Sequence, residues 1–148
     1  EGVDDPVQEM QPKREMTREK GLPTEDVTQV LLRVSSTIWS IRAQALSELA
    51  VLIGSDRSTE QVPVLEKVAG AMLDKLSDPH YKVVHAALEC TAVLVSHFPR
   101  AVEPLLERLL PQLLLRAQEA REATRAAAQM AMQAVQLAFS SEQLLHVL

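Results

Sequence analysis

The sequence is poor in the residues that build disulfide-rich or β-sheet domains. Of its 148 residues, 3% are aromatic, four are glycine and one, Cys90, is a cysteine. A lone cysteine excludes an intramolecular disulfide, and so few glycines leave little material for tight hairpin turns. No apolar run approaches the ~18 residues that a membrane helix needs. With 47% hydrophobic residues, rich in Leu, Ala and Val, the composition predicts an all-α protein of closely packed helices.

Several classes of function lack the side chains that they require. A net charge of −5 argues against a nucleic-acid surface, which needs clustered Lys and Arg. The four histidines have no i,i+4 pairing and no cysteine pair, and the glycines are too scattered for a phosphate loop. We therefore expect no enzyme, metal, cofactor, small-molecule substrate or membrane contact, and we interpret Cys90 as a packing residue. The lone cysteine and the absence of a secretory signal pattern favour a cytoplasmic setting.

The chain divides into a short polar segment and one domain. Residues 1–20 are highly charged and carry few large apolar side chains, which predicts a flexible tail. Residues 21–148 form the predicted domain. Its first helix, after Thr24, carries Val27, Val30, Leu31 and Val34 on one side and should cover the open end of the core.

The remaining apolar periodicity predicts three antiparallel helix pairs: 38–53 with 59–76, 79–97 with 100–116, and 119–138 with 141 onward. Starting signals come from Ser36 or Thr37, a Ser58/Gln61 capping box, Asp78-Pro79, Glu119, and Ser140 or Ser141. Gly54 should end the first of these helices, and Pro111 should kink the fourth. Leu49 and Leu88 should be fully buried.

The first helices of the three pairs repeat one another. Ala45-Leu46 aligns with Ala87-Leu88 and then with Ala128, in steps of 42 and 41 residues, and Arg42 aligns with Arg125. Helical hairpins of this period are typical of HEAT and armadillo arrays. The sequence therefore predicts an α-solenoid of about three HEAT-like hairpins, in which Arg42 and Arg125 bond a carboxylate or helix end of the neighbouring repeat.

Three stretches resemble one family. WSIRAQAL matches the W-x-x-R-x-x-A-L opening of TOG domains, the tubulin-binding HEAT arrays of microtubule regulators. LSDPHYKVVHAALECTAVLVSHF and EPLLERLLPQLLLR are similar to the second repeat of TOG domains in the CLASP and crescerin groups. The resemblance covers about residues 35–139. It implies a module that binds αβ-tubulin and a location on microtubules, including those of cilia or centrosomes.

The resemblance also implies which residues meet tubulin. In the family, the turns inside the hairpins form one binding edge with an aromatic anchor, a role that falls here to Trp39. Candidates in the second and third turns are His80, Tyr81, Lys82, Arg116 and Arg121. The alternative is a HEAT scaffold that binds another protein without tubulin affinity, because Ser40 replaces a frequent Lys and Glu119 and Glu122 would repel an acidic partner. An exposed Trp39 favours the first hypothesis and a Trp39 buried under the N-terminal helix favours the second.

Overall fold

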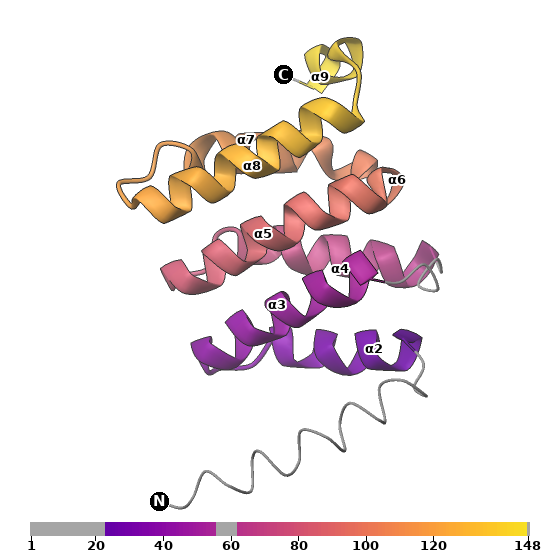
Figure 1. Ribbon diagram of the computed structural model, residues 1–148, viewed down its shortest axis with the longest axis vertical. Helices are drawn as coiled ribbons and strands as arrows, with labels where there is room; N and C mark the ends of the chain where they lie inside the picture. The colour runs from indigo at the N-terminus through magenta and orange to yellow at the C-terminus, as the bar shows by residue number, and fades with distance from the viewer. Residues whose placement is uncertain (1–22, 56–61, 148) are drawn as a thin grey trace, which may run out of the picture.

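The computed structural model describes residues 23–55 and 62–147, and within these ranges the chain forms a helical solenoid with no β-strand (Figure 1). The front layer in Figure 1 consists of α3 (Trp39–Ser55), α5 (Tyr81–His97) and α8 (Glu122–Ala138), stacked one above another. The all-α solenoid predicted from the sequence is confirmed.

A second layer lies behind the first. It consists of α2 (Pro23–Val34), α4 (Val62–Lys75) and a broken helix made of α6 (Pro99–Val102), the 3₁₀ turn η1 (Glu103–Leu105) and α7 (Leu106–Arg116). The short helix α9 (Ser141–Val147) follows α8. None of the described helices is long and apolar enough to cross a lipid bilayer.

The helices pair in a different frame from the predicted one. Helix α3 packs on α2 and α5, α4 packs on α5, and α8 packs on α5 and α7. The close hairpins are thus α2/α3, α4/α5 and α7/α8, because short turns join their members directly. The predicted pairs were shifted by one helix: α2 pairs with α3 and buries Val27, Val30 and Val34 at one end of the core.

Aliphatic side chains of both layers fill the core. Leu49 and Leu88 are fully buried, as predicted. Buried alanines at Ala45, Ala87 and Ala128 occupy equivalent positions of α3, α5 and α8, which lets successive front-layer helices approach closely. The repeat register read from the sequence is therefore the packing register of the structure.

Two predicted helix starts were placed too early. Helix α5 begins at Tyr81, and its N-cap is His80, whose side chain accepts a hydrogen bond from the Lys82 amide. Asp78 instead accepts from the His80 amide and so shapes the preceding turn. Helix α8 begins at Glu122 and not at Glu119. The start of α9 matches its prediction, because Ser140 and Gln143 bond each other's backbone amides in a reciprocal capping box.

The predicted end of α3 at Gly54 was one residue early, and a break before α7 was not predicted. Gly54 lies inside α3, which continues to Ser55 without a left-handed residue. Helix α7 runs through Pro111, where both Pro111 and Glu107 are exposed, so that water can satisfy the carbonyl that lacks an amide partner. A separate break lies at Pro104 in η1, a position that was not singled out from the sequence. The predicted tail at 1–20 and the Ser58/Gln61 capping box lie outside the described residues.

Candidate functional site

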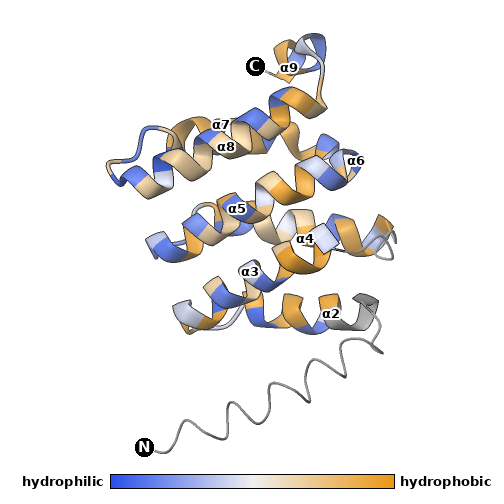
Figure 2. Cartoon of the chain, viewed as in Figure 1, coloured by the Kyte–Doolittle hydropathy of each residue, from blue (hydrophilic) through white to orange (hydrophobic). Residues whose placement is uncertain are grey.

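Three short turns meet along one edge of the solenoid. They span residues 35–38, 76–80 and 117–121 and lead into α3, α5 and α8. The starts of these helices lie one above another at the left of Figure 1, and Figure 2 shows hydrophilic residues at the starts of α5 and α8. Because these turns join the members of each hairpin, this turn edge is the intra-hairpin edge that the resemblance singles out.

Aromatic rings from two of the turns form one stack. The ring of His80 lies parallel to that of Trp39, with 3.8 Å between centroids, and 5.1 Å from that of Tyr81. The Arg121 guanidinium covers the Tyr81 ring at 3.5 Å, and Lys82 Nζ lies 5.5 Å from the centre of the Trp39 ring. We call Trp39, His80, Tyr81 and Arg121 the edge stack. It joins all three hairpins through cation–π and ring contacts.

A buried ion pair fixes the centre of this stack. Arg42 Nε and Nη2 donate to the two carboxylate oxygens of Asp78, at 2.8 and 3.0 Å, and both side chains are largely buried. The same carboxylate accepts a hydrogen bond from the backbone amide of His80, with 2.9 Å between the nitrogen and Asp78 Oδ1. Arg42 in the first turn of α3 thus sets the backbone of the next turn, and that backbone places the His80 ring between Trp39 and Tyr81.

The charge state of Asp78 follows from these contacts. Burial by itself would raise the pKa of this carboxyl, but the hydrogen bonds from Arg42 and from the His80 amide outweigh burial and hold the pKa below its usual value. Asp78 is therefore ionised at neutral pH. The bond from Arg42 to a neighbouring carboxylate was predicted from the sequence and is confirmed.

Arg116 does not join the edge stack. Its side chain is largely buried, and its guanidinium pairs with Glu119 inside the third turn. Arg125 donates to the carbonyl oxygens of Glu119 and Ala120 in the turn before its own helix, and not to the neighbouring repeat as predicted. Pairing with Arg116 offsets the charge of Glu119, so Glu122 is the exposed carboxylate left beside the stack.

The exposure of the rings separates the two hypotheses stated above. Trp39 is 39% exposed and Tyr81 is 42% exposed. The N-terminal helix α2 therefore does not cover Trp39. Five predicted residues, Trp39, His80, Tyr81, Lys82 and Arg121, come together on one edge, whereas Arg116 does not. That Asp78 organises them was not predicted from the sequence. The Asp-Pro-His order could have signalled this, because Asp often accepts the amide two residues later in a turn.

One curated protein is similar to this chain. It is a CLIP-associated protein from Arabidopsis thaliana, 32% identical over 116 residues, and the match covers 77% of this chain but 8% of that protein. The two are distant relatives over this segment. No family model matches the sequence, and no solved structure matches it. The relationship agrees with the CLASP-type resemblance of the stretches LSDPHYKVVHAALECTAVLVSHF and EPLLERLLPQLLLR. It says nothing of the remainder of the larger protein.

Two titratable side chains away from the edge stack, Cys90 and His85, have packing or hydrogen-bonding partners within α5 and the core. Cys90 is fully buried, and burial raises the pKa of its thiol to about 12, which keeps the thiol protonated at neutral pH. His85 bonds Glu89 one turn later at 3.1 Å, on the partly exposed side of α5. Across the described ranges, no group of three or more His, Cys, Asp or Glu side chains could hold a metal ion.

Proposed function

We propose that this solenoid is a microtubule-regulatory binding module, not an enzyme, and that it binds αβ-tubulin through the turn edge. The observation that carries the proposal is the edge stack, an exposed Trp and Tyr flanked by Lys82 and Arg121. Protein interfaces are dominated by a few such aromatic and Arg anchors, and tubulin is an acidic partner that cations would steer towards this edge. The similarity to a CLIP-associated protein supports the same assignment.

The organisation of the stack supports binding as a rigid surface. Trp39 and Tyr81 are held in place by His80, and His80 is held by the Arg42–Asp78 pair. Side chains that are already ordered lose less entropy when a partner binds. We place the module in the cytoplasm on microtubules, and a role at cilia or centrosomes is part of the same proposal.

A HEAT-type scaffold that binds another protein is the second candidate function. Two features of the turn edge favour it: Ser40 offers no cation beside Trp39, and the exposed Glu122 lies next to Arg121 in the chain. Both features would reduce the attraction of an acidic partner.

Co-elution with tubulin on a size-exclusion column at low ionic strength tests the proposal. We expect the wild-type protein to co-elute and Trp39→Ala to abolish detectable binding, because loss of a central aromatic anchor costs about 2 kcal/mol or more. Leu137→Ala is the matched control, since it truncates an 89% exposed apolar side chain on α8 outside the turn edge. Failure of the wild-type protein to co-elute, or a Trp39→Ala variant that loses thermal stability but not affinity, leaves the scaffold function standing.

Reversal of the charge on Lys82 tests electrostatic steering separately. Lys82→Glu should weaken tubulin binding strongly at low salt and less at high salt. At 0.1 M ionic strength, exposed charges more than about 10 Å apart are largely screened from one another. Arg100→Glu is the matched control, because Arg100 is exposed and lies on α6, beyond the other end of α5. Equal losses in the two variants would mean that the turn edge has no electrostatic preference for tubulin.

A further inference from the structure

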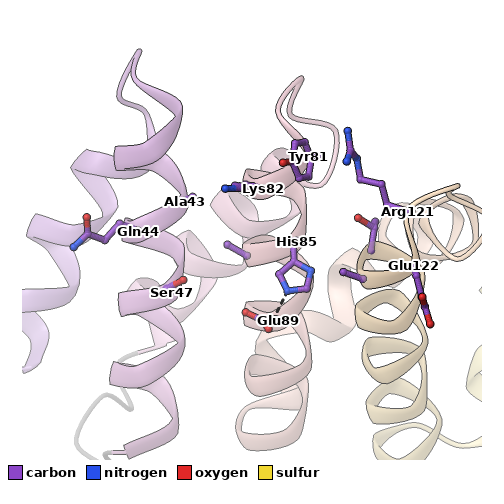
Figure 3. A pocket seen from close by; sticks show the side chains of 12 residues that line it. Ala43, Gln44, Ser47, Tyr81, Lys82, His85, Glu89, Arg121 and Glu122 are labelled. Atoms are coloured by element: carbon purple, nitrogen blue, oxygen red, sulfur yellow. Dashed lines mark hydrogen bonds and ion pairs between the residues drawn. The ribbon is translucent and has the colours of Figure 1, made fainter.

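The front layer is hollowed over α5, beside the turn edge (Figure 3). A groove of about 750 Å³ lies there, with α3 on one side and α8 on the other. Its lining includes the small side chains of Ala43, Ser47, Ala86 and Ala123. Small side chains at neighbouring positions of three helices leave the volume open, and it falls within the usual range of ligand pockets, about 300–1,000 Å³.

The charges along the groove are separated. Lys82 and Arg121 are at the end next to the turn edge, and among the described residues neither has an ion-pair partner. Glu89 lies further along α5, and its carboxylate is hydrogen-bonded to the His85 ring. Glu122 also lines the groove, and Figure 3 shows its side chain directed away from Lys82. One end of the groove therefore offers two unpaired cations beside the Tyr81 ring.

We propose that this groove binds a short acidic peptide segment of a partner protein. Carboxylates of the peptide pair with Lys82 and Arg121, and a medium-sized aliphatic side chain of the peptide fills the space over the alanines. Neither part suffices alone, because exposed ion pairs contribute little and small apolar contacts lack direction. Trp39, the aromatic anchor of the turn edge, does not line the groove, whereas Tyr81, Lys82 and Arg121 belong to both surfaces.

Ser47 provides the most specific variant for a test. It is exposed in the middle of α3 and lines the groove, and no hydrogen bond of its side chain supports the edge stack. Ser47→Glu places a like charge beside the bound acidic peptide. We expect the affinity of the Ser47→Glu variant for the acidic peptide to fall by about fivefold or more, since like charges brought together at an interface are costly. Gln129 is an exposed residue of α8 outside the groove. Gln129→Glu adds the same charge there and should change the affinity for the peptide by less than about twofold.

The probe is a dye-labelled EDLEDL peptide, and its affinity for the whole chain is measured by fluorescence anisotropy at low salt. KKLKKL reverses the charge of the peptide, and EDGEDG removes the aliphatic side chains. We expect EDLEDL to bind and both other peptides to bind at least about tenfold more weakly, a difference of roughly 1.4 kcal/mol. Trp39→Ala should lower EDLEDL binding by less than about twofold even if tubulin binding is lost, because Trp39 does not line the groove and contacts it through Lys82.

Three outcomes would overturn the proposal. EDLEDL and KKLKKL could bind equally, Ser47→Glu and Gln129→Glu could have equal effects, or EDLEDL could fail to bind at millimolar concentration. Preferred binding of KKLKKL would assign the groove to a basic partner instead. None of these results depends on whether tubulin binds the turn edge.

Discussion

Arg42 in α3 and Arg125 in α8 occupy the same register position but have different partners. Each donates to the carbonyl oxygen six residues earlier, Ser36 for Arg42 at 3.0 Å and Glu119 for Arg125 at 3.1 Å. Only Arg42 also reaches a carboxylate of the next hairpin, Asp78. The same residue thus closes its own turn in both helices, but it couples neighbouring hairpins only at the first position.

The apolar register shows a parallel difference between α5 and α8. Leu88 and Val95 of α5 are fully buried, whereas Gln129 and Gln136, at the same register in α8, are exposed. Within the described residues, α8 therefore presents an exposed side, on which Met130 and Leu137 also lie, where α5 presents a packed one.

The comparison predicts its largest effect in the core. Leu88→Ala should lower the free energy of unfolding by about 2–5 kcal/mol, because it removes buried methyl groups and leaves a cavity. Gln129→Ala at the same register should change it by less than about 0.5 kcal/mol, as is usual for exposed sites. Urea denaturation followed by circular dichroism measures both. Similar urea midpoints for the two variants would show that the two helices do not differ in this way.

The next effect concerns the coupling of hairpins. Asp78→Asn should cost about 1.5–3 kcal/mol at pH 7, because it weakens hydrogen bonds to a charged partner. The pKa of Asp78 is lower in the folded chain than in the unfolded one. Its contribution is therefore complete above the unfolded value, about 3.9, and is lost as the pH falls through the folded value.

Denaturation of both proteins between pH 7 and pH 3 measures this linkage. The difference in unfolding free energy between wild type and Asp78→Asn should be constant near neutrality and shrink in the acid range. The fluorescence of Trp39, the one tryptophan in the sequence, should change in the variant because the position of the stacked His80 ring depends on Asp78. A constant difference at all pH values would exclude ionised Asp78 as the source of the coupling.

The sequence predicted the helices and their register better than their pairing and boundaries. Periodicity reports which side of a helix is buried, so Leu49 and Leu88 were placed correctly. It does not report which neighbour covers that side, and the pairs were assigned one helix out of frame. Capping residues were harder still, because Asp78 and His80 both offer acceptors and only the bond from Arg42 determines that Asp78 shapes the turn while His80 caps the helix.

The candidate site was predicted in part for the same reason. Register alone brings Trp39 and Tyr81 to one edge, because equivalent positions of a solenoid stack. Arg121 is one residue before Glu122, the equivalent position in α8. Register cannot reveal that Arg116 turns back onto Glu119, since that depends on the local path of the third turn. The parallel stacking of His80 on Trp39 is likewise a tertiary contact that no sequence spacing contains.

The smallest predicted effect is at Arg125. Arg125→Met keeps the aliphatic part of the side chain but removes the bonds to the Glu119 and Ala120 carbonyl oxygens, and should cost about 0.5–1.5 kcal/mol. Carbonyl oxygens do not titrate, so the loss should be the same at pH 7 and pH 3, unlike that of Asp78→Asn. Arg42→Met is the matched variant. It should lower the free energy of unfolding by more than Arg125→Met does, and this loss should become smaller at low pH, where Asp78 is protonated. Equal, pH-independent losses for the two arginine variants would mean that both serve only their own turns, and the coupling assigned to Arg42 would be wrong.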